Sequence, residues 1–240
     1  MGKNTVDESL IAMYSNYYES DDILQKRKIT AVQTLEHIQA VLNGHLPGKL
    51  LDVGCGEGSL MEQMSHKKFA DKLYAVEVSK SGVETTRSKN IPELVEILEF
   101  DGYQIPYPDK FFDLAVSIHV LEHVEHERLF ITELKRVSNH IVIEVPLEHT
   151  IRVSEAMKLG QQYGHINFYT VDTFANLLNT CGLKIEAIKV FPSSVELHKH
   201  MYGNFKGLLK YFLRKSALSI APSLSTKFMT YLCTVYCTAA

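Results

Sequence analysis

The sequence has few of the features that mark secreted or membrane-spanning proteins. Its four cysteines form no CxxC pair and no repeated spacing, and no apolar run follows the N-terminal residues MGKNTVDESL. No stretch approaches the roughly 20 consecutive apolar residues that a membrane-spanning helix needs. Residues 216–240 come nearest, but Pro222, Lys227 and several hydroxyl side chains interrupt them. We therefore predict a cytoplasmic protein with reduced thiols and no transmembrane segment.

An excess of positive charge is also missing. The chain has 25 Lys and Arg against 28 Asp and Glu, a formal net charge of −3. Because binding to a phosphate backbone usually requires a basic surface, nucleic acid is a disfavoured partner. No long polar tract is present, and 45% of the 240 residues are hydrophobic. These values predict one folded domain with a packed core over residues 1–240.

The hydrophobic pattern changes once along the chain, near Lys49. Before it, apolar residues at three- to four-residue spacing predict an amphipathic helix that ends at Asn43 and Gly44. These residues are Ile29, Val32, Leu35, Ile38 and Leu42. After it, runs rich in Val, Ile and Leu alternate with helical stretches, which predicts an α/β fold: a doubly wound, mainly parallel sheet covered on both faces. We expect strands at LLDV, LYAVEV, VEILEF, FDLAVSI, HIVIEV, LKIEAIKVF and MTYLCTVYCT.

Four parts of the chain follow from this pattern. We expect an N-terminal helical cap over residues 1–47, a core over 48–191, a helical insertion over 192–228 and a last strand over 229–240. The insertion is partly basic and contains the segment LLKYFLRK. We expect it to cap the carboxyl end of the sheet and to be more mobile than the strands.

A glycine-rich turn follows the first predicted strand. The segment DVGCGEG runs from Asp52 to Gly58 and leads into a helix, whose unpaired amides and positive dipole end favour a ligand there. Its spacing is GxGxG, whereas the dinucleotide fingerprint is GxGxxG, which weakens an NAD-binding interpretation. The second strand ends at Glu77, where a carboxylate can accept hydrogen bonds from ribose hydroxyls.

These segments together resemble the class I S-adenosylmethionine-dependent methyltransferases. The resemblance covers residues 50–190 and rests on LDVGCGEG, AVEVS, EFDGYQIPYPDKFFDLAVSIHVLEHV, ELKRV and GHINFYT. It is greatest to the methyltransferase type 11-like domains, which include ubiquinone-pathway O-methyltransferases. It implies a seven-stranded sheet in the order 3-2-1-4-5-7-6 with an antiparallel last strand. It also implies cofactor contacts: Asp52, Gly54 and Gly56 at the methionine part, Glu77 at the ribose, Asp101 and Gly102 at the adenine, with Gly58 and His119 beside them.

A cluster of histidines and a carboxylate follows the fourth strand. If the segment after Ile118 were helical, His119, Glu122 and His123 would share one face at i, i+3 and i+4. His165, in GHINFYT, follows the fifth strand and would also lie where ligands approach the strands' carboxyl ends. We therefore expect these four side chains to form one site.

The same cluster resembles the E-x-x-E-H plus distant His pattern of metal-dependent O-methyltransferases, including the small-RNA 2′-O-methyltransferases. His119 stands where the first glutamate would be, and imidazoles with one carboxylate suit Zn, Mn, Fe or Co better than Mg. A divalent metal held by His119, Glu122, His123 and His165 is one interpretation. In a second, no metal binds and His123 or His165 is the general base. In a third, VLEH only contacts the cofactor or holds its loop.

The predicted function is methyl transfer from S-adenosylmethionine to a small-molecule acceptor, at oxygen. The acceptor would lie above the strand ends, near Tyr14, Tyr17, Tyr18, Tyr202 and Phe205, although aromatic residues at helical spacing more often belong to a core. Two alternatives stay open. One is an NAD-dependent oxidoreductase, and the other is a non-catalytic cofactor- or partner-binding module whose LLKYFLRK segment docks on a membrane or a protein. The sequence leaves the oligomeric state undetermined.

Overall fold

A seven-stranded sheet forms the centre of the protein. The computed structural model describes residues 21–239, without the side chains of residues 21, 161, 162 and 239. The sheet has the order β3-β2-β1-β4-β5-β7-β6. Only β7 is antiparallel to its neighbours, so the order and direction predicted from the resemblance are confirmed. The strands are β1 (Lys49–Val53), β2 (Lys72–Glu77), β3 (Leu94–Glu99), β4 (Phe112–Ile118), β5 (Ser138–Pro146), β6 (Leu183–Phe191) and β7 (Leu232–Ala239).

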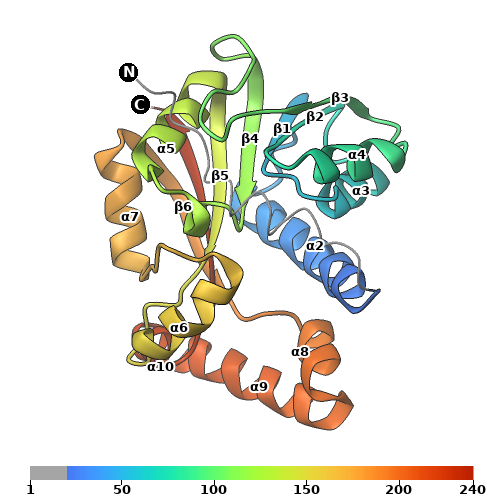
Figure 1. Cartoon of the computed structure of the whole chain (residues 1–240). Helices are drawn as coiled ribbons and strands as arrows, with labels where there is room; N and C mark the ends of the chain where they lie inside the picture. Colours follow the sequence, from blue (N-terminus) through green and yellow to red (C-terminus); the bar gives the residue numbers. More distant parts are fainter. Residues whose placement is uncertain (1–20, 240) are drawn as a thin grey trace.

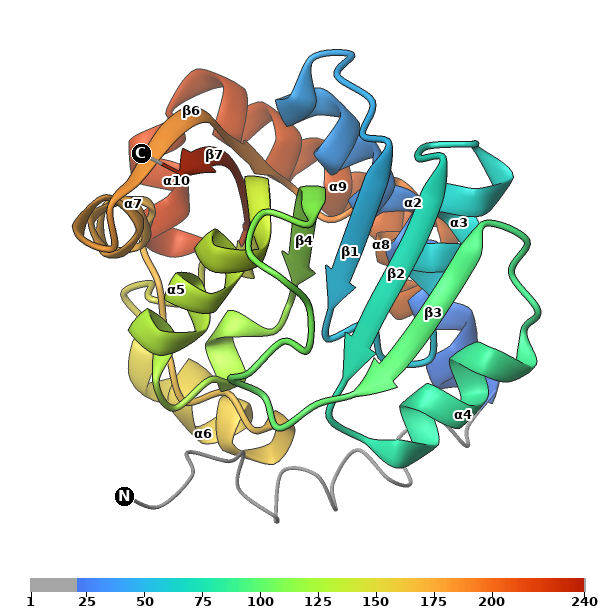
Figure 2. The ribbon, with the colours of Figure 1, turned by 90° about the horizontal axis from the view of Figure 1, so that it is seen from above.

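Helices cover both faces of this sheet (Figure 1). The described helices are α2 (Asp21–Leu42), α3 (Ser59–His66), α4 (Lys80–Ser88), α5 (Glu127–Val137), α6 (Val153–Tyr163), α7 (Val171–Thr180), α8 (Val195–Tyr202), α9 (Asn204–Ile220) and α10 (Pro222–Phe228), with a 3-10 turn η1 (Leu121–His123). Helices α2, α3 and α4 pack on one face, and α5 and α7 on the other. Figure 2 shows the strand order from above, with α4 beside the β3 edge.

Alternation along the strands explains this two-sided burial. Leu50 and Leu51 are neighbours in β1, yet Leu50 belongs to the core under α2 and α3, and Leu51 to the core under α5 and α7. Both side chains are fully buried. A strand that buries both of its faces needs the continuous apolar runs seen in the sequence. The doubly wound α/β prediction is therefore confirmed.

The first described helix differs from its predicted pattern at one position. Val32 is 46% exposed, whereas Ala31 and Leu35 are buried against the sheet side. The buried stripe is rotated slightly from the predicted one because α2 packs against α3, the edge strand β6 and its neighbour β7 together. The end of the helix is as predicted, since Asn43 and Gly44 adopt φ values of 50° and 87°.

Helix α6 has no counterpart among the predicted elements. It follows β5 and ends at Gly164, which adopts the left-handed conformation with φ 75°. Its apolar side chains are largely exposed; Met157 and Leu159 are 46% and 58% accessible. An exposed helix lacks the regular buried stripe by which a helix is recognised in a sequence.

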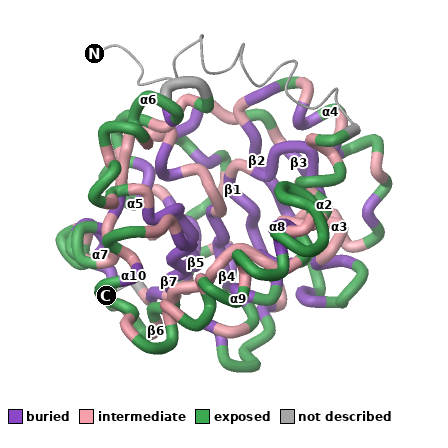
Figure 3. The backbone as a smooth tube through the Cα atoms, turned by 90° about the horizontal axis from the view of Figure 1, so that it is seen from below, coloured by how far each residue is buried: buried purple, intermediate pink, exposed green. Residues whose placement is uncertain are grey.

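The predicted insertion is helical and lies where it was expected. Figure 1 shows α8, α9 and α10 below the sheet, together with α6, at the end where the loops after β4 and β5 emerge. Helix α8 also contacts α2, and Ser194 at its N-terminus accepts a hydrogen bond from Leu197 N at 3.2 Å. Figure 3 colours most of α9 as exposed, in contrast to the buried strands β4 and β5. Whether these helices form a lid stays a prediction.

Hydrogen exchange measures this difference directly. Because Gly207 is the one residue of α9 that is buried, we expect α9 amides to exchange at least about 100-fold faster than those of β4 and β5, in line with the spread between local and global opening. Mass spectrometry of peptic fragments gives both rates in one experiment. Equal protection in α9 and β4 would contradict a loosely held insertion.

Candidate functional site

The glycine turn leaves no room for larger side chains. Gly54, Gly56 and Gly58 have φ values of 83°, 58° and 80°, which favour glycine. A Cβ atom on Gly54 would lie 2.5 Å from Cγ2 of Val120, so the loop after β1 touches the loop after β4 directly. The predicted tight turn is therefore present, at the carboxyl end of the sheet.

Glu77 stabilises this turn by accepting two backbone hydrogen bonds. Its carboxylate accepts from Gly56 N at 2.9 Å and from Ser79 N at 3.0 Å. Ser79 is in turn the N-cap of α4 and accepts from Gly82 N at 3.1 Å. The structure thus places Glu77 buried next to the glycine turn, and its contact with a cofactor stays a prediction.

Two further carboxylates at the turn are buried without full hydrogen bonding. Asp52 and Glu57 are 2% and 0% exposed, and Asp52 Oδ2 and Glu57 Oε1 lack a hydrogen-bond partner among the described residues. Burial, and then the neighbouring Glu77, raises the pKa of Asp52 to about 7. Arg27 of α2 forms an ion pair with the other oxygen of Glu57. The turn is therefore an acidic, incompletely paired site.

Sequence reasoning missed both members of the Arg27–Glu57 pair. For Glu57, the available signal was an acidic residue inside the glycine turn. For Arg27 no signal existed, because it lies 30 residues from its partner, on a helix with several other basic side chains.

Asp101 and Gly102 form the turn after β3. Asp101 Oδ1 accepts from Tyr103 N at 2.9 Å and Gln104 N at 2.7 Å, and Gly102 has a φ of 89°.

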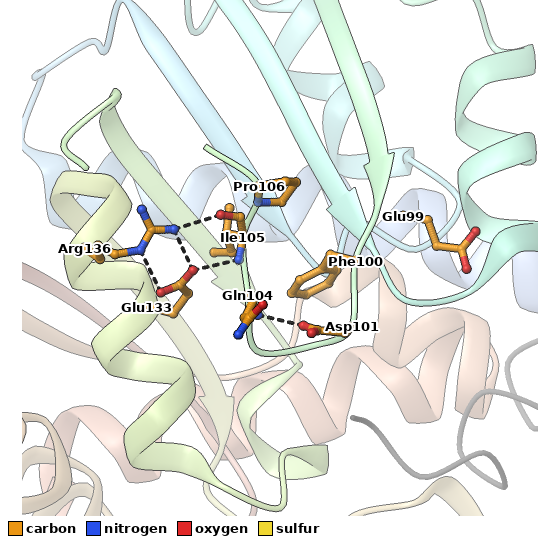
Figure 4. Close-up of a pocket in the computed structure, with 8 residues that line it drawn as sticks. All are labelled: Glu99, Phe100, Asp101, Gln104, Ile105, Pro106, Glu133 and Arg136. Atoms are coloured by element: carbon orange, nitrogen blue, oxygen red, sulfur yellow. Dashed lines mark hydrogen bonds and ion pairs between the residues drawn. The ribbon is translucent and has the colours of Figure 1, made fainter. Parts of the chain in front are cut away.

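A surface depression of about 480 Å³ lies beside this turn, and Figure 4 shows its lining. Its lining residues are Glu99, Phe100, Asp101, Gln104, Ile105, Pro106, Glu133 and Arg136. Arg136 fixes one wall by donating to Glu133 Oε1 at 2.6 Å and to Ile105 O at 2.8 Å.

The predicted helical face after β4 is wrong. Only Leu121–His123 form a 3-10 turn, and His119 precedes it with a φ of 55°, outside any helix. His119 is turned toward two buried carboxylates instead. Its Nδ1 lies 3.3 Å from Glu122 Oε1, and its Nε2 lies 3.3 Å from Glu144 Oε1.

Glu144 ties His119 to the N-terminal helix and the last strand. Its Oε2 lies 2.7 Å from His37 Nδ1 and accepts from Thr234 Oγ1 at 2.5 Å. Burial would lower the pKa of His119, but the adjacent Glu122 and Glu144 carboxylates outweigh it and raise that pKa to about 10. Burial likewise opposes ionisation of Glu144, yet His119 and His37 lower its pKa to about 2. The two carboxylates therefore favour the protonated form of His119, which is not part of the group that the other three candidate ligands form.

Glu122, His123 and His165 do lie together. One potential ligand atom from each falls within 4.8 Å of the others, the one such group of three among residues 21–239. His123 Nδ1 lies 3.0 Å from Gly164 O, and His165 Nδ1 lies 2.7 Å from Glu148 Oε2. The two imidazole rings meet edge to face with centroids 4.7 Å apart.

The surroundings of His123 and His165 shift the pKa values of the two side chains in opposite directions. Burial lowers the pKa of His123, although Glu122 partly opposes this effect. For His165, burial also acts to lower the pKa, but the adjacent Glu148 carboxylate outweighs burial and raises it. The pair therefore combines an imidazole that favours its neutral form with one that favours its charged form.

Backbone contacts hold the GHIN loop against η1. Ile166 N and Asn167 N both donate to Glu122 O, at 2.8 and 3.0 Å. The Asn167 amide donates to Leu121 O at 3.0 Å and to Val124 O at 2.7 Å. These bonds explain how two motifs 40 residues apart in the sequence become one rigid site.

Only two of the aromatic residues predicted to line an acceptor site, Tyr202 and Phe205, belong to the described part of the chain. Tyr14, Tyr17 and Tyr18 lie outside the described residues. Tyr202 is 41% exposed and Phe205 is 81% exposed. No contact places Tyr202 or Phe205 beside the histidine cluster.

The family of the chain follows from comparison with known proteins. Residues 27–188 match the family described as a methyltransferase domain. The chain belongs to the methyltransferase-domain family. This match includes the glycine turn, Glu77 and the whole histidine cluster, and it confirms the family resemblance drawn from the sequence.

Relatives of this methyltransferase domain act on different atoms. Ajmaline N-methyltransferase of Rauvolfia serpentina is 31% identical over 110 residues, which are 44% of this chain and 38% of that protein. The ubiquinone biosynthesis O-methyltransferase of Caulobacter is 26% identical over 143 residues, 55% of this chain and 54% of its relative. The chain thus aligns with only about half or less of each relative's length.

Solved structures share the fold at low sequence identity. The geranyl diphosphate C-methyltransferase of Streptomyces coelicolor, solved with Mg²⁺, geranyl diphosphate and S-adenosyl-L-homocysteine, has a TM-score of 0.64 at 14% identity. The match covers 98% of this chain and 88% of that one. A chain of the complex between the Haloferax volcanii Trm112 activator and a methyltransferase has a TM-score of 0.68 at 12% identity, covering 95% and 97%. These likenesses concern the fold of the methyltransferase domain.

The substitution Glu144→Gln tests the buried ion-pair chain. Because it leaves His119 and His37 facing an uncharged amide, we expect the free energy of unfolding at pH 7 to fall by about 3 kcal/mol. The lowered pKa of Glu144 means that its ionised carboxylate stabilises the fold fully at pH values above 4.5. This stabilisation is lost as the pH falls from 4.5 toward about 2. The acid loss of stability should therefore be shallower in the variant.

Urea unfolding between pH 3 and 8 measures both effects. Glu148→Gln serves as the control, because its side chain is 22% exposed and, within residues 21–239, forms an ion pair with His165 only. Equal stability of Glu144→Gln and the wild type at pH 7 would contradict the structural role of this carboxylate.

Proposed function

We propose that this chain transfers the methyl group of S-adenosylmethionine to an oxygen atom of a small-molecule acceptor. Membership of the methyltransferase-domain family supports the reaction class. The relatives include N-, O- and C-methyltransferases, so the choice of oxygen rests on the histidine cluster rather than on the comparisons. We further propose a cytoplasmic protein.

Two buried carboxylate oxygens at the glycine turn support this proposal. Asp52 Oδ2 and Glu57 Oε1 are buried acceptors without a hydrogen-bond partner among residues 21–239, which is unfavourable unless a ligand donates to them. The ammonium and sulfonium groups of S-adenosylmethionine are positive and suit this site. The pyrophosphate of NAD is negative and would be repelled by carboxylates at the same place. The acidic turn therefore favours the methyl donor over the nicotinamide cofactor.

The remaining cofactor contacts follow the strand ends. We assign the ribose to Glu77, the adenine to Asp101 and Gly102, and the close backbone approach to Gly54 and Gly56, with Gly58 completing the turn. His119 stays a candidate neighbour of the cofactor, because it is 29% exposed at the end of β4. Its ring lies outside the group of ligand atoms that Glu122, His123 and His165 bring together, so we do not assign it as a metal ligand.

Methyl transfer needs alignment and proton removal more than a covalent nucleophile. The donor's sulfonium becomes a neutral thioether as the methyl group passes to the acceptor oxygen in line. The acceptor hydroxyl loses its proton, and the imidazole of His123, which favours its neutral form, can receive it; His165 can do so only in its neutral form. The GHIN loop and η1 hold both rings in place for this step.

The Glu122–His123–His165 group also fits a divalent cation. Metal-binding histidines usually donate their second nitrogen to a carbonyl or carboxylate, and here His123 and His165 contact Gly164 O and Glu148 through Nδ1. Two imidazoles with one carboxylate suit Zn, Mn, Fe or Co. A cation bound there would supply Lewis acidity that favours loss of the hydroxyl proton.

The substitution Asp52→Asn separates cofactor binding from folding. We expect affinity for S-adenosylmethionine to fall by about 1.5–3 kcal/mol, the scale for a hydrogen bond to a charged group. We expect stability to change in the opposite direction. Because the pKa of Asp52 is raised from 3.8 to about 7, its ionisation lowers the stability of the fold progressively as the pH rises through this range. An uncharged Asn side chain does not ionise and therefore does not lower the stability in this way. At pH 8 the variant should be more stable by about 1 kcal/mol or more.

Isothermal calorimetry with S-adenosylmethionine and with NAD, combined with urea unfolding, provides the measurements. Glu84→Gln on the exposed side of α4 is the control. Unchanged affinity for S-adenosylmethionine in Asp52→Asn, or binding of NAD by the wild type, would refute the cofactor assignment.

The histidine cluster is tested by metal content and turnover. We expect elemental analysis of protein purified without chelators to detect a bound divalent metal, and His123→Ala and His165→Ala to lower formation of S-adenosylhomocysteine by about 100-fold or more. His140→Ala, far from the cluster, is the matched control. Metal-free protein with activity lost in one variant would exclude the metal and support a histidine acting as general base. Metal-free protein with full activity in both would refute the site.

A further inference from the structure

Helix α9 is amphipathic, and its apolar side faces away from the protein. Large apolar residues recur at i, i+3, i+4, i+7 and i+8 from Phe205, which places them on one side of the helix. All are exposed to solvent, from 38% for Leu208 to 83% for Ile220. We call this set the α9 face; it consists of Phe205, Leu208, Leu209, Phe212, Leu213 and Ile220.

The opposite side of α9 fixes this orientation. A Cβ atom on Gly207 would lie 2.4 Å from His198 O, so the helix packs there directly on the backbone of α8. Arg214 donates to Thr230 O at 2.9 Å, and Tyr231 donates to Arg214 O at 3.0 Å. The side with Gly207 and Arg214 is therefore the attached one, and within residues 21–239 the α9 face is left exposed.

Positive charges flank the α9 face on both sides. At 100° per residue, Lys206 and Lys210 lie along one margin and Lys215 along the other. Residues 195–228 contain six Lys and Arg against one Glu, although the whole chain has a net charge of −3. Four of these six basic residues lie on α9 itself, on the helix that exposes the apolar stripe.

We propose that the α9 face binds the surface of a lipid bilayer that contains anionic phospholipids. The helix would lie parallel to the membrane, with its apolar side chains among the acyl chains and its lysines at the headgroup phosphates. No helix among residues 21–239 could cross a bilayer, so this contact would be on the surface. Helix α9 lies on the same side of the sheet as the loops after β4 and β5, which would bring the histidine cluster near the membrane (Figure 1).

A bilayer suits this surface better than a protein groove does. The stripe is convex, follows a helix of 17 residues, and has lysines at both margins. A groove that accepts a helix would need acidic residues along both of its rims, whereas anionic lipids supply negative charge on all sides.

Co-sedimentation with vesicles tests the proposal independently of methyl transfer. We expect the full chain to bind vesicles of 70% phosphatidylcholine and 30% phosphatidylglycerol, and to bind pure phosphatidylcholine at least about tenfold more weakly. The variant Phe205→Asp/Phe212→Asp should lose binding to both. The variant Lys206→Glu/Lys210→Glu/Lys215→Glu should lose at least about tenfold in affinity for the anionic vesicles.

Matched controls use exposed residues elsewhere on the protein. Leu46→Asp and Lys67→Glu/Lys72→Glu, at the opposite end of the sheet, should bind like the wild type, and circular dichroism confirms folding of every variant. Absence of vesicle binding by the wild type, or equal binding by wild type and α9 variants, would overturn the proposal. A wild-type dimer that Phe205→Asp/Phe212→Asp dissociates, without vesicle binding, would assign the face to a second copy of the chain instead.

Discussion

The carboxylate of Glu144 holds together segments that are far apart in the sequence. It is fully buried at the end of β5 and contacts His37 on α2, Thr234 on β7 and His119 after β4. His119 then contacts Glu122, which belongs to the candidate acceptor site. One alternating series of imidazoles and carboxylates thus runs from the N-terminal helix to the mouth of the site. Removing the Glu144 carboxylate would deprive both His37 and His119 of a partner at once.

The site contains two acidic regions, which differ in how their carboxylates are paired. At the glycine turn, Asp52 and Glu57 are incompletely paired, and Asp52 is less easily ionised than an exposed carboxyl. After β4, the carboxylates are paired with imidazoles and stay ionised. The first arrangement suits capture of a cationic donor, and the second suits a rigid acceptor site. The unfavourable burial at the turn is offset by the packing of the two cores around it.

Much of the fold could be predicted, because strands buried on both faces have continuous apolar runs. The strand order came from the family resemblance. The site was predicted less completely, and the reason is conformational. Residues 119–123 were expected to be helical, but the left-handed conformation of His119 turns its ring toward Glu144. The partnership of His37 with Glu144 joins positions 107 residues apart, and no local pattern indicates it. The same holds for Arg27 and Glu57.

A crystal structure of the chain with S-adenosylhomocysteine tests the central claim most directly. The account predicts that the amino acid part of the ligand contacts Asp52 and Glu57, that its ribose hydroxyls contact Glu77, and that its sulfur atom faces the Glu122–His123–His165 group. A ligand whose sulfur faces away from that group, or whose amino acid part does not contact Asp52 or Glu57, would contradict it.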